Sequence, residues 1–259
     1  MRSGTFQADG ETLAYNHYLP AGEPREFALS LHGAGPAGRE GIGYLAEHLA
    51  SRGSSLFCLD FSGHGDRTGH LRESSLSRRV VQAKSALRVV SRRPTILVGT
   101  SMGGHVASSI LADVAPEFSI LFCPAIYGDG SIDLPFDDRF TAAIRKPSSF
   151  EHSSLRRDLG RYRGKSLLNI GDDDRIIPPR VIDIYREELR KGGELALLRL
   201  PGAPHNIHGW ARQSDGNRTI ILRAIDDLLQ RSATLAFGSS RRRPFDDDGS
   251  NVWQRRQGR

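Results

Sequence analysis

The chain has 259 residues, of which 38% are hydrophobic and 25% are charged. These values fit one large globular domain with a sizeable core, and they exclude a wholly disordered chain. No run of 18 apolar residues occurs, so no membrane span is expected. The N-terminus lacks the apolar region of a signal peptide, and a cytoplasmic location is therefore predicted.

The formal net charge is +6, but half of it comes from the last stretch of the chain. Residues 232–259 hold six arginines and three aspartates and contribute +3. A dispersed charge of this size is typical of a solvated surface, and neither zinc-ligand spacing nor a phosphate-binding loop occurs, so no nucleic-acid partner is expected. Cys58 and Cys123 each lie within an apolar run, which favours buried thiols over a disulfide.

Two strand-like runs open the chain, and Asp9-Gly10 between them is a hairpin turn signal. Strands and helices alternate from there, which predicts βαβ units and a mostly parallel sheet. Up to residue 98 the expected elements are strands Thr5–Ala8, Thr12–Tyr18 and Phe27–Leu31, a helix through Tyr44, Leu45, His48 and Leu49, strand Ser55–Leu59, helix Arg78–Ser91 and strand Thr95–Val98. Within Arg78–Ser91, the helical spacing of Val80, Val81, Leu87 and Val90, with Lys84 as an outlier, predicts the helix.

The alternation is interrupted once in the second half of the chain. Residues 125–163 carry only short apolar patches among glycine, proline and charges, and we interpret them as a small lid that covers a site. The other expected elements are helix His105–Val114, strands Phe118–Cys123 and Ser166–Ile170, helix Arg180–Lys191, strand Leu195–Leu200 and helix Thr219–Arg231. The predicted domain therefore covers residues 1–231, and residues 232–259 form a tail whose composition favours disorder.

Gly99-Thr100-Ser101-Met102-Gly103 is a Gly-x-Ser-x-Gly sequence between an expected strand and an expected helix. This is the context of a nucleophile elbow, a sharp turn that lifts the serine hydroxyl clear of the strand end. A serine needs a base to take its proton, and the base needs a group that orients it. The candidates are the aspartates of Gly171-Asp172-Asp173-Asp174, which follow the expected strand Ser166–Ile170, and His205, which follows the expected strand Leu195–Leu200.

Four motifs make residues 5–231 resemble the α/β-hydrolase superfamily. They are His32-Gly33-Ala34-Gly35 after a strand, Asp60-Phe61-Ser62-Gly63-His64-Gly65 after the next, the elbow itself, and Gly171-Asp172-Asp173-Asp174 followed by Pro178 and later by His205. The resemblance implies an α/β-hydrolase fold, with a mostly parallel central sheet, helices on both faces and a short lid insertion. It also implies Ser101 as nucleophile, His205 as base and Asp174 as the orienting acid.

Some of these assignments leave alternatives open. Asp172 competes with Asp174 for the acid, and His208 competes with His205 for the base, although a wall residue is the better interpretation of His208. The three adjacent aspartates lack a neighbouring histidine, so no metal is expected, and no other cofactor is implied.

The resemblance places the oxyanion hole at the backbone N–H groups of Ala34 and Met102, with Gly33 as the alternative to Ala34. We interpret His32 as a brace for this loop and His64 as a turn residue.

Apolar residues of the lid are candidates for the wall of an acyl pocket: Phe136, Phe140, Ile144 and Phe150. The end of the lid is basic, with Arg156, Arg157, Arg161, Arg163 and Lys165 against Asp158. A solvated helix face explains these charges, and the functional alternative is attraction of an anionic substrate.

The predicted function is a serine hydrolase that cleaves a carboxylester or thioester of a small molecule through an acyl-enzyme. The opposing hypothesis is a protein that keeps the fold and binds a ligand or partner without turnover. Neither the substrate nor the oligomeric state follows from the sequence. A third idea, that the arginine-rich tail recruits a partner, concerns residues 232–259 alone.

Overall fold

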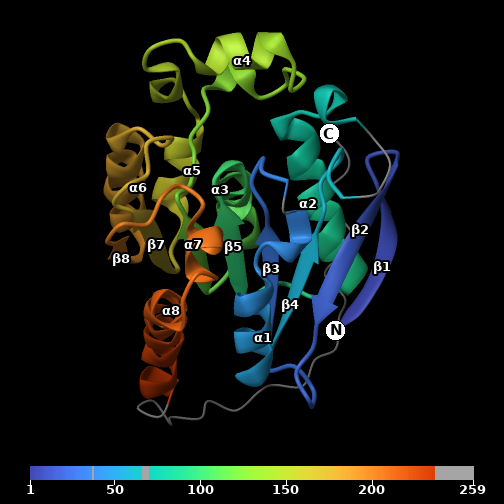
Figure 1. The fold of residues 1–259 in the computed structure, drawn as a ribbon, viewed down its shortest axis with the longest axis vertical. Coiled ribbons are helices and arrows are strands. Elements are labelled where there is room, and N and C mark those ends of the chain that lie inside the picture. The colour runs from blue at the N-terminus through green and yellow to red at the C-terminus, as the bar shows by residue number, and fades with distance from the viewer. Residues whose placement is uncertain (37, 66–69, 237–259) are drawn as a thin grey trace, which may run out of the picture.

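The computed structural model describes residues 1–36, 38–65 and 70–236, and these ranges form an eight-stranded sheet with helices on both faces (Figure 1). The strands are β1 (Arg2–Ala8), β2 (Glu11–Tyr18), β3 (Glu26–Leu31), β4 (Ser54–Leu59), β5 (Ile96–Thr100), β6 (Phe118–Phe122), β7 (Lys165–Gly171) and β8 (Glu194–Leu200). Their order across the sheet is β1-β2-β4-β3-β5-β6-β7-β8. Only β1 with β2 and β2 with β4 pair antiparallel, so the predicted mostly parallel sheet is confirmed.

The first turn follows directly from its sequence. Asp9 and Gly10 have φ angles of 53° and 75°, both in the left-handed region. Two such residues form the tight turn whose twist matches a β-hairpin, and glycine adopts this conformation without a steric penalty. The predicted hairpin between β1 and β2 is therefore confirmed.

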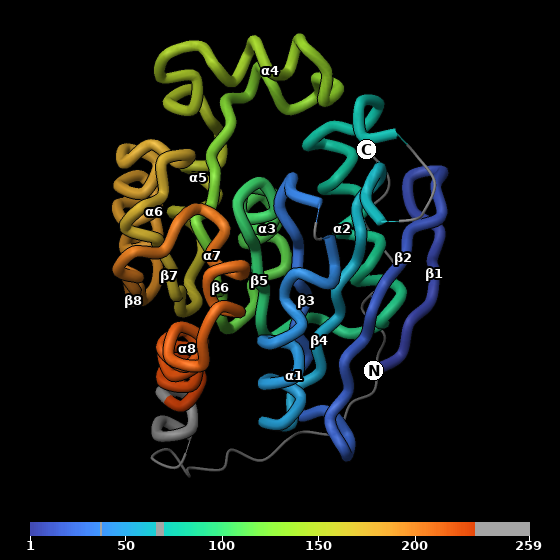
Figure 2. Tube along the Cα trace, viewed as in Figure 1, coloured from blue at the N-terminus to red at the C-terminus, as the bar shows by residue number. Residues whose placement is uncertain are grey.

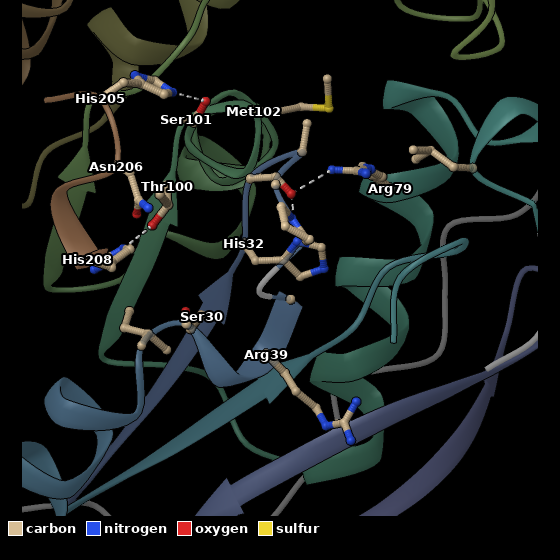
Figure 3. A pocket seen from close by; sticks show the side chains of 18 of the residues that line it. Ser30, His32, Arg39, Arg79, Thr100, Ser101, Met102, His205, Asn206 and His208 are labelled. Carbon is tan, nitrogen blue, oxygen red and sulfur yellow. Dashed lines mark hydrogen bonds between the residues drawn. The ribbon is translucent and has the colours of Figure 1, made fainter. Parts of the chain in front are cut away.

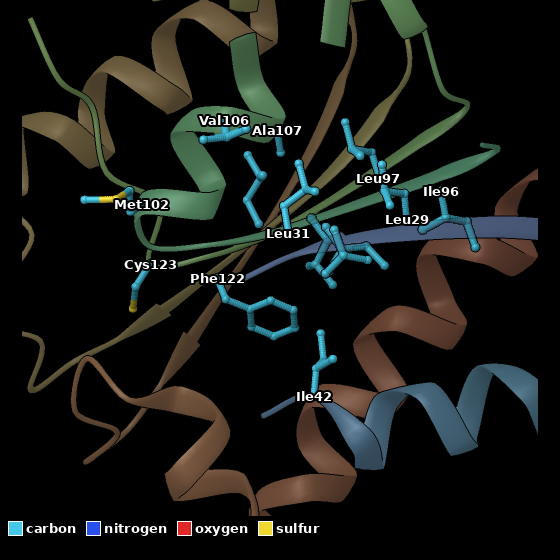
Figure 4. Packing of buried hydrophobic residues seen from close by; sticks show 14 of the residues in the cluster. Leu29, Leu31, Ile42, Ile96, Leu97, Met102, Val106, Ala107, Phe122 and Cys123 are labelled. Carbon is cyan, nitrogen blue, oxygen red and sulfur yellow. The ribbon is translucent and has the colours of Figure 1, made fainter. Parts of the chain in front are cut away.

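Helices cover both faces of the sheet. Helices α1 (Gly43–Ser51) and α8 (Asp215–Ala236) lie on one face, and α2 (Leu76–Val90), α3 (Met102–Val114), α5 (Leu155–Arg161) and α6 (Pro179–Gly192) lie on the other (Figure 1). Strands β4 and β6 are buried along their whole length because apolar layers pack on both sides of them. Figure 4 shows this double layer, with Val106 and Ala107 of α3 on one side of the sheet and Ile42 on the other.

The buried face of α2 includes small and polar residues. It consists of Leu76, Arg79, Gln82, Ala83 and Ala86. Of the apolar residues at helical spacing, Val80, Leu87 and Val90 pack partly buried against the core, whereas Val81 is 48% exposed. Polar groups of Arg79 and Gln82 bind loop backbone instead of solvent.

Residues 125–163 form short helices, η3 (Asp129–Ser131), α4 (Asp138–Ile144), η4 (Ser149–Glu151) and α5. The segment with α4 stands beyond the carboxyl ends of the central strands (Figure 2). In contrast, α5 packs against α3 and α6 within the helical layer. The segment over the site is thus the part of the expected lid that precedes α5.

The remaining short elements lie in loops. They are η1 (Gly38–Glu40), η2 (Leu71–Glu73) and α7 (Ile207–Ala211). Helix α8 continues to Ala236, past the expected end at Arg231, and the rest of the expected tail, 237–259, lies outside the described residues. Within the described ranges no helix has the length and apolar character needed to cross a membrane. Cys58 and Cys123 are both buried free thiols, as predicted.

Candidate active site

Ser101 lies at the turn between β5 and α3 in an unusual backbone conformation. Its φ and ψ angles are 52° and −116°, a region that residues with a side chain rarely adopt. Hydrogen bonds hold it there: its N–H donates to the Phe122 carbonyl at 2.9 Å, and its carbonyl accepts from Gly104 N at 2.9 Å and Ala125 N at 3.0 Å. Strain of this kind persists only where the surroundings fix it, and it aims the Ser101 hydroxyl away from the strand end.

The glycines of the elbow are required by close packing. A Cβ at Gly103 would overlap the carbonyl oxygens of Leu31 and His32, and a Cβ at Gly104 would overlap Pro124. The start of α3 therefore lies directly on the end of β3 and on the loop that follows it. This contact sets the distance between the elbow and the His32-Gly33 loop.

The structure brings Ser101, His205 and Asp174 together in one hydrogen-bonded row. Figure 3 shows the Ser101–His205 part of it. His205 Nε2 lies 2.9 Å from Ser101 Oγ, and His205 Nδ1 lies 2.8 Å from Asp174 Oδ2. Asp174 follows β7 and His205 follows β8, so both side chains come from carboxyl ends of parallel strands. In this row one imidazole nitrogen faces the hydroxyl while the other is held by a carboxylate.

The hydrogen bonds around Asp174 favour its ionised form. Burial of its side chain opposes the charge, but hydrogen bonds from His205, Cys123 and the Ile176 N–H outweigh burial and lower its pKa to about 2. Its second oxygen, Oδ1, accepts from the N–H groups of Ile176 at 2.8 Å and Ile177 at 3.1 Å. A fixed carboxylate at this position stabilises the His205 tautomer with the proton on Nδ1.

The thiol of Cys123 is a neighbour of this row that the sequence did not identify. Donor atoms of Cys123, Asp174 and His205 lie within 4.8 Å of one another. Burial raises the pKa of the Cys123 thiol well above its usual range, and the adjacent Asp174 carboxylate raises it further. A thiol that keeps its proton donates to the Asp174 carboxylate.

The alternative residues occupy other positions. Asp172 forms an exposed ion pair with Arg199 at 2.8 Å and does not reach His205. His208 is buried, with Nε2 2.8 Å from Thr100 Oγ1 and Nδ1 3.1 Å from Tyr44 Oη. Burial lowers the pKa of His208 to about 4, so it is a neutral wall residue at physiological pH.

The loop after β3 lies against the elbow. A Cβ at Gly33 would lie 3.2 Å from the Ser101 Cβ, so this loop touches the serine directly. Ala34 and Met102 both line the cavity beside Ser101, and within the described residues their backbone N–H groups have no acceptor. Met102 N is also at the first turn of α3, where the helix dipole favours negative charge.

His32 holds this loop in place through two hydrogen bonds. Its Nε2 accepts from the Phe61 N–H at 3.0 Å, which leaves Nδ1 to donate to the Gly33 carbonyl at 2.6 Å. Burial lowers the pKa of His32 well below its usual value, so the ring is neutral and joins the loops after β3 and β4. His64 lies in the second of these loops, with Nε2 3.4 Å from the Ala34 carbonyl.

A cavity of about 980 Å³ opens at the serine. Gly33, Phe136, Phe140 and Ile144 line it, whereas Phe150 does not. The expected basic cluster at the end of the lid contributes no side chain to it either, since α5 packs on the body of the domain. The described lining residues include no aspartate or glutamate, but they include three arginines, Arg39, Arg79 and Arg212.

Arg79 is the lining residue that the sequence reasoning missed. It occupies the buried face of α2 between Leu76 and Ala83, at helical spacing. A charged residue on such a face was the available signal, because an arginine is almost never fully buried without a partner.

Comparisons with known proteins agree with this architecture. The family model described as serine aminopeptidase, S33, matches residues 22–149, which include Ser101. No match is found among curated proteins. Solved structures with the same fold include Est1E from Butyrivibrio proteoclasticus with bound ferulic acid, at 16% identity and a TM-score of 0.67, covering 89% of this chain and 99% of that one.

Two further solved structures share this fold. A thioesterase domain from the curacin biosynthetic pathway has 16% identity and a TM-score of 0.63, covering 85% of this chain and 99% of that one. A monoacylglycerol lipase from Paleococcus ferrophilus has 20% identity and a TM-score of 0.62, covering 81% of this chain and 96% of that one. The chain therefore has the α/β-hydrolase fold.

Proposed function

We propose that this protein is a serine hydrolase that cleaves a carboxylester or thioester of a small molecule. The observation that carries the proposal is the row of Ser101, His205 and Asp174, with contacts of 2.9 and 2.8 Å. Beside it lie two N–H groups that have no acceptor in the described part of the chain. A weak nucleophile, a base and an orienting carboxylate in this order are what acyl transfer requires.

In the first half of the reaction, His205 Nε2 takes the Ser101 proton as Oγ attacks the acyl carbon. The carbonyl oxygen gains a negative charge, and the Ala34 and Met102 N–H groups stabilise it. His205 then returns the proton to the leaving alcohol or thiol, and an acyl-enzyme remains. Asp174 stabilises the imidazolium in both directions because its carboxylate stays ionised.

In the second half, a water molecule takes the place of the leaving group. His205 removes a proton from this water, whose oxygen attacks the acyl carbon and forms a second oxyanion. Collapse of this intermediate releases the carboxylic acid, and the proton on His205 returns to Ser101 Oγ. No step requires a metal or an organic cofactor.

Esters and thioesters fit the cavity better than the peptide substrate of an aminopeptidase, the activity in the description of the matching family. An aminopeptidase must bind a free ammonium group, and a carboxylate is the usual partner of such a group. The described residues that line the cavity supply none. An esterase, a thioesterase and a lipase are among the structures with this fold, which also favours oxygen and sulfur esters.

The proposal is tested by turnover of short p-nitrophenyl esters. The Ser101→Ala variant is expected to lose at least about a thousandfold in kcat, because the nucleophile is gone. Ser109→Ala is the matched control, since Ser109 lies in the same helix and its hydroxyl only binds the His105 carbonyl within that helix. An aminoacyl p-nitroanilide hydrolysed faster than the esters would instead favour a peptidase.

The binding-protein hypothesis gives a different result in the same assay. A protein that only binds a ligand shows no steady-state ester turnover in its wild-type form, even where an intact triad is labelled by a fluorophosphonate. Turnover that survives in Ser101→Ala would contradict the role proposed for the serine.

A further inference from the structure

Arg79 is an arginine of the active-site cavity without a counter-ion. It projects from α2, its side chain is 0% exposed, and it lines the same cavity as Ser101. In Figure 3 it approaches the Gly33 loop from the side opposite His205. Its Nη1 donates to the Gly33 carbonyl at 3.4 Å, a long contact that supplies little stabilisation.

The surroundings of the guanidinium are aromatic. Its Cζ lies 4.9 Å from the ring centre of Phe61 and 4.9 Å from that of Phe136. Among the described residues no carboxylate forms an ion pair with it. Burial lowers the pKa of Arg79 to about 10, so the group stays charged at physiological pH. A buried charge held only by aromatic rings and one carbonyl is unfavourable unless an anion joins it.

The donors that remain are arranged for a carboxylate. Nε and Nη2 are buried and have no hydrogen-bond partner in the described protein. These two N–H groups point in parallel from one edge of the guanidinium, and that edge binds both oxygens of a carboxylate. Nη1, the nitrogen that contacts Gly33, is on the other side.

The other two arginines of the cavity do not offer this combination. Arg39 forms an ion pair with the buried Asp60. Arg212 is exposed and donates to the Gly41 carbonyl at 2.9 Å. Arg79 is therefore the described cavity residue that is charged, fully buried and without an acidic partner.

We propose that Arg79 binds a carboxylate carried by the substrate, so that the site selects esters or thioesters with an anionic end. This inference rests on the proposed hydrolase function and adds a substrate class to it. Phe136 is partly exposed and belongs to the segment before α4, so its ring is the cover that the substrate carboxylate displaces to reach Nε and Nη2.

The test compares paired substrates. One set consists of p-nitrophenyl monoesters of dicarboxylic acids of increasing length, and a second set carries the carboxylate on the alcohol side. Each acid is measured against its neutral primary amide. For at least one pair, wild-type kcat/KM is expected to favour the acid by about tenfold or more, because a charge-assisted pair replaces an unpaired buried charge.

Arg79→Met is expected to reduce this preference to about one, because the acid loses its charged partner and the neutral amide has no such partner to lose. Arg88→Met is the matched control, because Arg88 is an exposed arginine of the same helix and lies outside the cavity. It removes the same charge and is expected to leave the preference unchanged. A wild-type enzyme without preference, or an Arg79→Met enzyme that keeps it, would overturn the proposal.

A binding measurement separates this inference from the proposed function and does not depend on the variant's folding. Free dicarboxylates of the same lengths are expected to raise the melting temperature of wild-type and Ser101→Ala protein. If no ester is hydrolysed, the hydrolase proposal fails, and the thermal shift still decides whether the site binds carboxylates. Absence of any shift would contradict carboxylate binding by Arg79.

Discussion

Asp174 and Asp172 are two residues apart and have opposite environments. Asp174 accepts hydrogen bonds from His205 and from two backbone N–H groups, and its pKa is about 2. Asp172 is paired with Arg199 at the surface. In the sequence, only motif spacing favours Asp174 over Asp172. Both are aspartates of the same loop, and they differ in where their side chains point.

Asp174→Asn is expected to lower kcat by about a thousandfold to ten-thousandfold. The amide oxygen can still accept from Ile176 and Ile177, but the NH₂ group then faces His205 and stabilises the wrong tautomer. Steady-state turnover of a p-nitrophenyl ester measures the loss. Asp172→Asn serves as the control and should retain wild-type turnover within about twofold. Equal losses in both variants would contradict the assignment of the acid.

The residues of the site differ in how far the sequence could identify them. Ser101, Asp174 and His205 carry motif spacing and follow expected strands, so their meeting was predictable. Cys123 and Arg79 carry no motif, and their positions depend on how β6 meets β7 and how α2 meets α3. These contacts are tertiary. A local pattern marks Arg79 only as a charged residue on a buried helix face, and it does not indicate that Arg79 or Cys123 reaches the site.

At the scale of elements, the parallel strands were the most predictable part of the fold. Their apolar runs are continuous because helices cover both faces, and β4, β5 and β6 were expected within two residues of their observed bounds. The short helices α4, α5 and α7 were not predicted. They have five to seven residues each, too few for a helical repeat to stand out.

The contact between α3 and β3 depends on the absence of a side chain at Gly103. Gly103→Ala is expected to destabilise the protein by about 2 to 3 kcal/mol, because the new Cβ meets backbone carbonyls that cannot move aside. The urea midpoint measures the change. Gly130→Ala in η3 is the control, since a Cβ there meets nothing within 4 Å. Its midpoint should stay close to that of the wild type, and a similar loss in the two variants would show that the close packing at Gly103 is not the cause.

At the scale of the whole molecule, buried neutral histidines link stability to pH. Burial lowers the pKa of both His105 and His208 to about 4, below the ordinary 6.5. Between these values the unfolded chain binds more protons than the folded protein, so the free energy of unfolding falls as the pH falls from about 6.5 towards 4. Above 6.5 neither histidine contributes to this dependence.

The expected decline is on the order of 3 kcal/mol for each fully buried histidine across that window. His105→Asn removes one of these groups, and the new amide oxygen can still accept the Tyr127 N–H that His105 Nδ1 accepts. Urea titrations at several pH values should therefore show a shallower decline for this variant. A decline as steep as that of the wild type would mean that His105 does not titrate as its burial predicts.

The most direct test of the central claim is to trap the nucleophile. The wild-type protein is treated with a fluorophosphonate, and the adduct is located by mass spectrometry of its peptides. The account predicts a single covalent adduct on Ser101, lost in Ser101→Ala and retained in Ser109→Ala. An adduct on another serine, or labelling that persists in Ser101→Ala, would contradict it.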